Sequence, residues 1–262
     1  MSSDGNGHRI AAITGATGAI GKAIAGGIAA QPGYEVVLIC RDGARGAAAA
    51  AEIRRRSGNP GVRVELADLS RPGEIAVLGR RWQGPVDLIV NNAAIAPRTR
   101  LETPEGIELQ LATNVLGYFW LIQALSARLR RGARVVNVAS YWAGDLELDD
   151  LEFRNRRYDN HLAYRQSKQA DRMLSAAFAR RLAEREIRVN ACHPGDVNSR
   201  LSNDLGFGGS ETPEQGAATP LWLATAPEIE GVTGGYFEGR RGTRCRCSEG
   251  AEQVEALFHY CE

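Results

Sequence analysis

The sequence TGATGAIG at residues 14–21 follows a short apolar run and opens a helix-compatible segment. Glycines at a strand-to-helix junction permit a tight turn and let the backbone approach a pyrophosphate, which the free N–H groups and dipole of the helix favour. A cramped turn without a ligand also selects glycine, so the position at the first junction carries the argument. The stretch predicts a nucleotide-binding loop. Its expected contact residues are Gly15, Thr17, Gly18, Ile20 and Gly21.

Short apolar runs rich in Val and Ile alternate with helix-length segments along the whole chain. This alternation predicts a Rossmann-type α/β fold, a doubly wound parallel sheet with helices on both faces. Without internal repeats or a linker of biased composition, residues 1–262 are expected to form a single domain. The predicted strands are 9–14, 35–40, 62–66, 86–91, 134–139 and 187–193, and the predicted helices are 19–31, 44–57, 71–82, 107–130 and 162–185.

Composition and charge argue against several classes of partner. The chain is 44% hydrophobic and 24% charged, which allows a sizeable core, and its net charge of +1 gives no electrostatic reason to expect nucleic acid or an anionic membrane. Residues 1–8 are polar, and no apolar run approaches the ~18 residues that span a bilayer. We therefore expect a cytoplasmic protein with neither a membrane nor a nucleic-acid partner.

The cysteines are odd in number and scattered, which favours a reducing compartment. Cys245 and Cys247 are one residue apart and could form a redox site or half of a metal site. No second ligand cluster accompanies them, so we expect no metal and interpret them as exposed thiols. The five cysteines are Cys40, Cys192, Cys245, Cys247 and Cys261.

Residues after the second predicted strand indicate which nucleotide is bound. An acid there usually holds a free ribose 2′-hydroxyl, whereas an arginine accommodates a 2′-phosphate. The chain has Cys40-Arg41-Asp42, which favours NADP over NAD through Arg41. Asp42 could point outward or cap the next helix. Lys22 could add charge near the phosphate or be a solvated helix residue.

Polar and small residues also follow the third and fourth predicted strands. Asp68 could bond the adenine amino group or cap the helix that follows, and Leu69 lies beside it. The Asn-Asn-Ala-Ala segment at 91–94 would let backbone lie against a cofactor, although a turn has the same composition. We count Asp68, Leu69, Asn91 and Ala93 as expected cofactor contacts.

Tyr164 and Lys168 stand four residues apart and so share one helical face. Lys168 is one of only two lysines among 32 basic residues. Free tyrosine titrates near 10, and lowering its pKa by two to three units takes roughly 3–4 kcal/mol, which a cation ~4 Å away supplies in a partly shielded site. The spacing predicts a catalytic pair, and a packing tyrosine with a surface lysine is the alternative.

The motifs as a set resemble the short-chain dehydrogenase/reductase family. The glycine loop, the 91–94 segment, Asn114, Ser140, the Tyr-x-x-x-Lys motif and residues 193–195 occur in that family's order across residues 9–240. The segments LICRD, LDDLEF, AYRQSK, NACHPG and EGVTGGYF look like its retinol dehydrogenase-like branch. The resemblance implies NADP and a lipophilic carbonyl or alcohol substrate.

The same resemblance implies individual roles. Tyr164 would be the general acid/base, Lys168 its electrostatic partner and a ribose ligand, and Ser140 the group that polarises the substrate oxygen. Asn114 would anchor a water-linked proton path. A homodimer or homotetramer is the family's usual assembly. Further cofactor contacts implied by the resemblance are Pro194, Gly195, Val197 and Ser199.

Four features depart from the family pattern. The glycine spacing G-x-x-G-x-x-G is that of longer epimerases and dehydratases, yet this chain is too short for their added substrate domain. Ala94 replaces a usual glycine. Ser140 and Tyr164 are 24 residues apart, so residues 145–160 are interpreted as an inserted loop. The membrane anchor of many animal retinol dehydrogenases is not expected here.

Substrate-side segments are less specific. The loop 196–212 holds three glycines that suit a mobile lid, or simply a flexible loop, and the tail 240–262 is expected to hold a short helix that covers the site or meets a partner subunit. Aromatic residues that could line an apolar pocket or belong to the core are Tyr141, Trp142, Phe153, Tyr158 and Phe207.

Three functions follow from these observations. The first is NADP(H)-dependent hydride transfer to or from a lipophilic ketone, aldehyde or alcohol, with Tyr164 moving the proton. The second is a dehydratase or epimerase that retains its cofactor. The third is a non-catalytic NADP(H)-binding regulator, which would have no need of Ser140, Tyr164 and Lys168.

Overall fold

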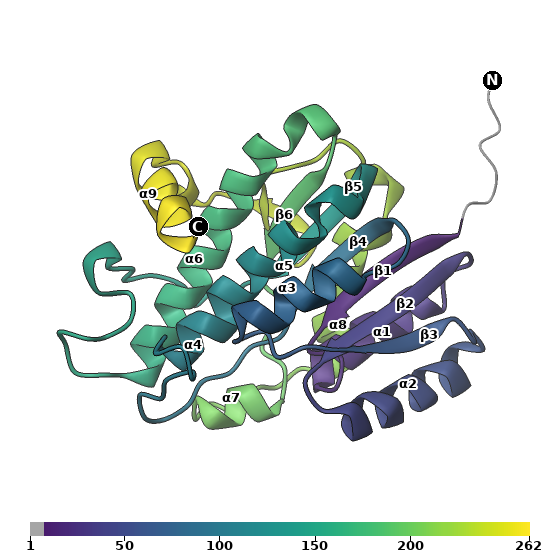
Figure 1. Ribbon diagram of the computed structural model, residues 1–262, viewed down its shortest axis with the longest axis horizontal. Coiled ribbons are helices and arrows are strands. Elements are labelled where there is room, and N and C mark those ends of the chain that lie inside the picture. The colour runs from purple at the N-terminus through teal and green to yellow at the C-terminus, as the bar shows by residue number, and fades with distance from the viewer. Residues whose placement is uncertain (1–7) are drawn as a thin grey trace.

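One eight-stranded sheet runs through residues 8–262, the part of the chain that the computed structural model describes (Figure 1). Its order is β3-β2-β1-β4-β5-β6-β7-β8, parallel throughout except for β8, which is antiparallel to β7. The order reverses between β1 and β4, where doubly wound sheets bind ligands. The strands are β1 Arg9–Thr14, β2 Tyr34–Cys40, β3 Val62–Leu66, β4 Val86–Asn91, β5 Leu129–Val138, β6 Arg188–Cys192, β7 Tyr236–Glu238 and β8 Arg241–Thr243.

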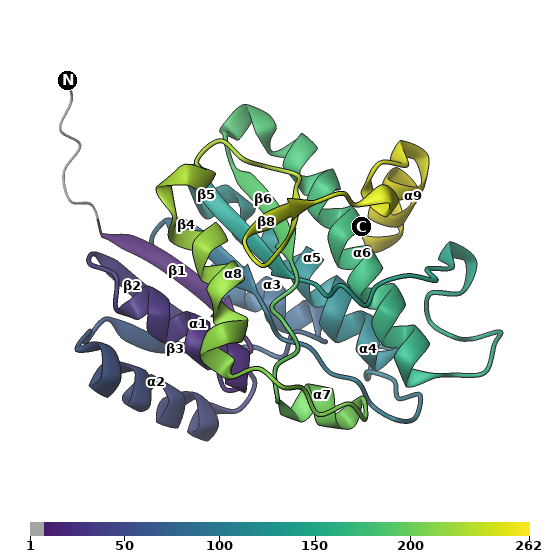
Figure 2. The ribbon, with the colours of Figure 1, turned by 180° about the vertical axis from the view of Figure 1, so that it is seen from behind.

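Helices cover both faces of this sheet, as Figures 1 and 2 show from opposite sides. One core cluster joins the sheet to α1, α2 and α8, and a second joins it to α3, α5, α6 and α9. The sequence-predicted doubly wound α/β fold is confirmed. The helices are α1 Ala19–Ala29, α2 Gly43–Ser57, α3 Pro72–Arg81, α4 Leu109–Leu111, α5 Gly117–Leu125, α6 Asn160–Arg181, α7 Arg200–Asp204, α8 Pro213–Thr225 and α9 Ala251–Cys261.

The predicted helix 107–130 is wrong in its continuity and in its end. A π-helical turn over Ala112–Leu116 separates α4 from α5, and β5 begins at Leu129, five residues before the predicted strand. Regular pairing with β4 starts only at Arg134, because a register irregularity and the positive φ of Gly132 interrupt the first half of β5. That irregular half lacks the alternation that marks a strand.

The C-terminal tail holds the expected helix, α9, whose position is now defined. Val254, Leu257 and Phe258 are buried in the core cluster of α5 and α6. The Phe258 ring centroid lies 5.0 Å from that of Phe119 and 5.2 Å from that of Phe178. The tail therefore completes the core beside α6 and takes no part in lining the pocket described below.

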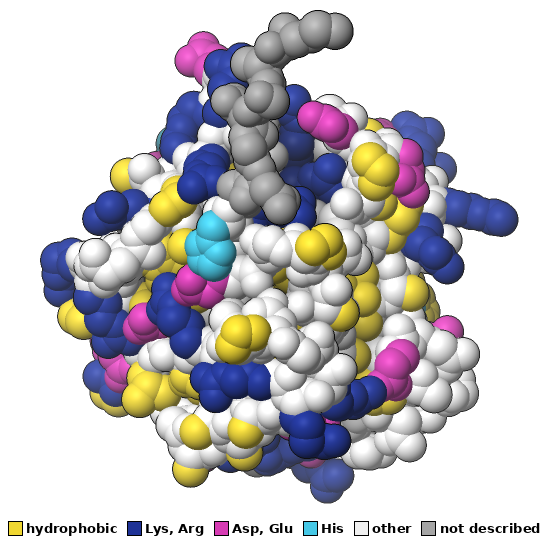
Figure 3. All heavy atoms as spheres, turned by 90° about the vertical axis from the view of Figure 1, so that its right-hand side faces the viewer, with side chains coloured by type: hydrophobic (Ala, Val, Ile, Leu, Met, Phe, Trp, Pro, Cys, Tyr) yellow, Lys and Arg dark blue, Asp and Glu magenta, His cyan; other side chains and the backbone are white. Residues whose placement is uncertain are grey.

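Charged side chains are dispersed over the molecule. On the face in Figure 3, Lys and Arg side chains occur at many places, with Asp and Glu among them. The helices within residues 8–262 are each too short or too polar to cross a bilayer.

Candidate active site

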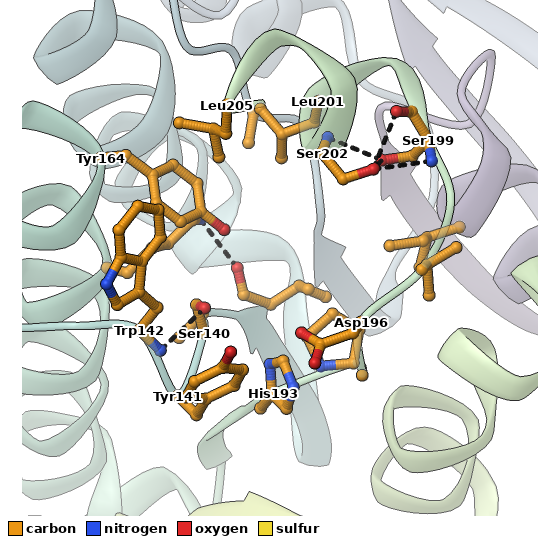
Figure 4. A pocket seen from close by; sticks show the side chains of 18 of the residues that line it. Ser140, Tyr141, Trp142, Tyr164, His193, Asp196, Ser199, Leu201, Ser202 and Leu205 are labelled. Carbon is orange, nitrogen blue, oxygen red and sulfur yellow. Dashed lines mark hydrogen bonds between the residues drawn. The ribbon is translucent and has the colours of Figure 1, made fainter. Parts of the chain in front are cut away.

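A pocket lies beyond the carboxyl ends of the strands next to the switch point. Asn92 follows β4, Ser140 follows β5, and Pro194 follows β6, so three separate strands contribute to its wall. Figure 4 shows Tyr164 with its hydroxyl pointing into this space, beside Trp142 and near Ser140. The pocket also brings together the predicted contact residues Ile20, Lys168, Gly195, Val197 and Ser199.

The glycine loop is held very close to the segment after β4. A Cβ on Gly21 would lie 2.4 Å from the carbonyl oxygen of Gly15, and one on Gly15 would lie 2.8 Å from Ala93 Cα. Asn92 Nδ2 donates a 3.2 Å hydrogen bond to the Thr14 carbonyl, and Thr14 Oγ1 accepts 2.9 Å and 3.1 Å bonds from the backbone N–H groups of Asn92 and Ala93. The loop is therefore closely packed against the segment after β4, with no room for a side chain at Gly15 or Gly21.

The helix that follows this loop begins at Ala19 with Gly18 as its N-cap, and no side chain among the described residues caps it. Uncapped N–H groups at a helix N-terminus favour an anion through hydrogen bonding and the helix dipole. Together with the missing Cβ at Gly21, this end of α1 fits a pyrophosphate. Thr17 lies in the turn and Ile20 in the first helical residues, and their contact with a cofactor stays a prediction.

Arg41 lies exposed just after β2, on the side where a 2′-phosphate would be expected. Asp42 caps α2 by accepting a 3.0 Å hydrogen bond from the N–H of Arg45, which decides between the two roles considered for it. Lys22 makes a 2.7 Å ion pair with Glu52, so its ammonium is directed to α2.

Three other predicted contacts use their side chains within the protein. Asn91 is fully buried and donates a 2.9 Å hydrogen bond to Asn137 inside the sheet, so only its main chain is available to a cofactor. Leu69 is buried in the core. Asp68 Oδ1 accepts bonds from the N–H and hydroxyl of Ser70. The N-cap of α3 is Arg71, so of the two roles considered for Asp68 the helix cap is wrong and the adenine contact stays a prediction.

The predicted catalytic set converges, because α6 carries Tyr164 and Lys168 past the end of β5. Asp159 starts this helix by accepting hydrogen bonds from the N–H groups of its first turn. Ser140 Oγ accepts a 3.0 Å bond from the Trp142 N–H. Lys168 Nζ lies 5.9 Å from the centroid of the Tyr164 ring, and both side chains are buried.

The pKa of Tyr164 is raised above its ordinary value: Lys168 lowers it as expected, but the net lowering expected from the sequence is not found. Burial raises this pKa more than the Lys168 charge and the hydrogen bond with Ser140 lower it. The negative charge of Asp171 also raises it. The sequence argument included the attraction of the ammonium but neither the loss of water around the phenol nor this second charge.

Asp171 is the site residue that sequence reasoning missed. Its Oδ2 lies 2.8 Å from Lys168 Nζ, and that ammonium also donates a 2.9 Å bond to the Val138 carbonyl. Burial is the largest single effect on the pKa of Lys168 and lowers it, but the charge of Asp171, the charges of two tyrosines and the bond to Asp171 together raise that pKa overall. Burial raises the pKa of Asp171 to about 6, against the effect of Lys168, so the pair is ionic at neutral pH. The signal was the i, i+3 spacing, which places both on one helical face.

Asn114 lies in the π-helical turn and connects two segments of the site. Its Oδ1 accepts a 2.9 Å bond from the Ile95 N–H, and its Nδ2 donates to the Ile95 carbonyl at 3.0 Å and to Ser167 Oγ at 3.3 Å. The side chain thus fixes the segment after β4 against the catalytic helix. Its part in a proton path stays a prediction.

An apolar wall closes the pocket on the side of the 196–212 segment. Leu201 and Leu205, from α7 and its end, pack with Trp142 and Tyr164, and the Phe207 ring lies 5.6 Å from that of Trp142. Ser199 N-caps α7 through a reciprocal pair of bonds with Ser202. The 196–212 segment therefore contains one short helix, Arg200–Asp204, beside the pocket and is a loop on either side of it.

Two of the aromatic residues expected in the pocket lie elsewhere. Phe153 and Tyr158 pack on each other with ring centroids 5.4 Å apart, and the Tyr158 hydroxyl donates to the Pro97 carbonyl at 3.1 Å. They hold the inserted 145–160 segment against the protein. Tyr141, Trp142 and Phe207 do line the pocket.

Comparison with known proteins agrees with this geometry. The family model for short chain dehydrogenases matches residues 9–206. A probable oxidoreductase from Streptomyces antibioticus is 38% identical over 90% of this chain and 86% of its own length. Retinol dehydrogenase 13 from Mus musculus is 34% identical over 87% of this chain and 75% of its own length. A short chain dehydrogenase from Burkholderia cenocepacia, solved in complex with NADP, superimposes with a TM-score of 0.71 and 26% identity, over 88% of this chain and 95% of that one.

The family match covers residues 9–206, and the alignment with the retinol dehydrogenase relative covers 87% of this chain. The resemblance expected from the glycine loop and the Tyr-x-x-x-Lys motif is therefore confirmed, including its likeness to retinol dehydrogenases. This chain belongs to the short-chain dehydrogenase/reductase family of oxidoreductases.

Proposed function

We propose that the protein is an NADP(H)-dependent oxidoreductase that transfers a hydride to a lipophilic ketone or aldehyde, or from the corresponding alcohol. The observation that carries this proposal is the convergence of Tyr164, Ser140 and Lys168 on one pocket that also meets the glycine cradle. A regulator that only binds the nucleotide has no use for a phenol and a hydroxyl directed into that pocket.

NADP(H) fits the residues at the other end of the pocket. The rigid loop and the uncapped start of α1 would hold the pyrophosphate, and exposed Arg41 would pair with the 2′-phosphate. The Burkholderia relative bound to NADP supports the same choice. When bound, the nicotinamide would supply or accept the hydride.

The chain's own groups would handle the proton and the substrate oxygen. Ser140 donates a hydrogen bond to that oxygen and favours the negative charge that develops on it. Tyr164 gives its proton to the oxygen in reduction and removes it in oxidation. Lys168 is held at the pocket by the Val138 carbonyl and stabilises the tyrosinate that forms.

A lipophilic substrate is supported by the apolar wall beside Tyr164. Leu201, Leu205, Trp142 and Phe207 present apolar surface there, and Phe207 is still 51% exposed. Covering such surface with an apolar ligand removes it from water, at roughly 25 cal/mol per Å². The relation to retinol dehydrogenase 13, named for a lipophilic alcohol, points the same way.

The deciding experiment follows NADPH oxidation with aromatic ketones, aliphatic aldehydes and long-chain enals, together with product analysis. We expect one NADPH consumed for each alcohol formed. Product without net NADPH consumption would support the dehydratase or epimerase alternative. Tight NADPH binding without turnover across the panel would support the regulator.

Arg41→Ala tests the nucleotide preference. We expect KM for NADPH to rise about 10–100-fold, because an arginine–phosphate contact is charge-assisted, while kinetics with NADH change little. Arg55→Ala removes an equally exposed arginine at the far end of α2 and is the matched control. Equal losses with both nucleotides in Arg41→Ala would contradict recognition of a 2′-phosphate.

Asp171→Asn tests how the buried ion pair tunes the tyrosine. Because the Asp171 carboxylate raises the pKa of Tyr164, its neutralisation should lower that pKa. Alcohol oxidation needs the tyrosinate, so the rising limb of its pH–rate profile should move down by about one pH unit. Asp149→Asn, at an exposed position, should leave the profile in place. A uniform loss of rate without a shift would indicate a packing role only.

A further inference from the structure

Two cysteine thiols lie in contact near the end of β5, the strand that leads to Ser140. Cys245 and Cys247 flank Arg246 after β8, and their sulfur atoms lie 3.2 Å apart. A one-turn 3-10 helix over Arg246–Ser248 holds them together, since the Ser248 N–H donates a 3.1 Å bond to the Cys245 carbonyl. Cys245 is buried, contrary to the sequence expectation of two exposed thiols, and Cys247 is partly exposed.

The groups around this pair favour the thiolate form of Cys245. A hydrogen bond from the Cys247 thiol, then bonds from Ser248 and the charge of Arg172, lower the pKa of Cys245 to about 5 against the effect of burial. The pKa of Cys247 is raised. A thiolate beside a thiol is the arrangement that attacks oxidants and then closes a disulfide. A metal is a poorer fit, because structural zinc takes four ligands and within residues 8–262 no group of three or more His, Cys, Asp or Glu side chains is placed to hold a metal ion.

The pair is also connected to the active site. Cys245 packs in a small cluster with Tyr236 and with Ala139, the residue before Ser140. Arg172, one turn after Lys168 on α6, donates a hydrogen bond to the Ser140 carbonyl. Its guanidinium lies 3.6 Å above the centre of the Tyr236 ring. Arg172 thus contacts the main chain of Ser140 and interacts electrostatically with the Cys245 thiolate.

We propose that Cys245 and Cys247 form a reversible disulfide when a hydroperoxide reaches them, and that Arg172 passes this change to Ser140. The Cys245 thiolate attacks the peroxide oxygen, giving a sulfenic acid and one water or alcohol. The Cys247 sulfur then displaces the hydroxyl, and a second water leaves. Two thiols are oxidised and one peroxide bond is reduced. The disulfide no longer carries the negative charge beside Arg172.

Hydrogen peroxide added to the full chain, followed by tryptic digestion without reductant, tests the first part. Trypsin cuts after Arg246, so the two cysteines separate when reduced and stay linked as a disulfide. We expect a fragment in which the two cysteine peptides are joined, with a mass two hydrogens below the sum of the reduced peptides. Dithiothreitol should separate them again. Cys245→Ser and Cys247→Ser should abolish it, and Cys261→Ser should keep it. Oxygen added to a single cysteine, a link to another cysteine, or no reaction would overturn the proposal.

Turnover measured on the same samples tests the coupling. This part depends on the proposed function, whereas the linked fragment does not. We expect the rate of carbonyl reduction to fall at least about threefold in the linked protein and to recover with dithiothreitol, while Cys245→Ser, which lacks the attacking thiolate, keeps its own rate in peroxide. An unchanged rate in fully linked protein would overturn the role of Arg172.

Discussion

Tyr164→Phe is expected to lower kcat by about 10²–10⁴-fold, the usual contribution of a general acid or base, while the dissociation constant of NADPH stays within about twofold. The phenol oxygen is the only atom lost, and the ring still packs with Trp142 and Leu205. NADPH titration by fluorescence and steady-state turnover on one preparation would separate the two effects.

Tyr260→Phe makes the same chemical change on the exposed part of α9 and should leave turnover unaltered. Ser140→Ala should reduce kcat by a smaller factor than Tyr164→Phe, because Tyr164 could still supply the proton. A Tyr164→Phe variant with full activity would remove the phenol from the mechanism, and one that no longer binds NADPH would assign Tyr164 a structural role.

Gly21→Ala should abolish useful NADPH affinity, with the dissociation constant rising about 100-fold or more. Its Cβ would lie 2.4 Å from the Gly15 carbonyl oxygen and 2.5 Å from Asn92 Nδ2. The first of these is backbone, so the loop itself must move. Overpacking of this kind costs typically about 1–3 kcal/mol, and about 2.7 kcal/mol corresponds to 100-fold in binding. Calorimetric titration with NADPH and thermal unfolding of the free protein measure both consequences.

Gly26→Ala is the matched control, since Gly26 lies one and a half turns further along the same helix and a Cβ there meets nothing within 4 Å. It should leave NADPH binding unchanged and stabilise the fold by about 0.5–1 kcal/mol, because alanine loses less backbone entropy in a helix. If both variants bind NADPH normally, the tight cradle is not needed for the cofactor.

Much of the sheet was predictable, because the parallel strands are short runs rich in Val, Ile and Leu and each crossover helix lies between two of them. Two of the errors fall where the backbone departs from regular helix or strand geometry. The π-helical turn at Ala112–Leu116 and the irregular start of β5 carry no sequence alternation of their own. The helix α8 was missed although Thr212 and Gln215 form a capping box at its start.

The sequence by itself determined the residue types at the site and their order. The helix fixes the spacing of Tyr164 and Lys168, and the junction between the first strand and the first helix fixes the place of the glycine loop. It could not determine their charge environment. Burial of the Tyr164 phenol, the Lys168–Asp171 ion pair and the contact between Cys245 and Cys247 depend on how α6, β5 and β8 pack. Desolvation and through-space charge act over a few ångströms in three dimensions, so only the tertiary structure decided which way those pKa values moved.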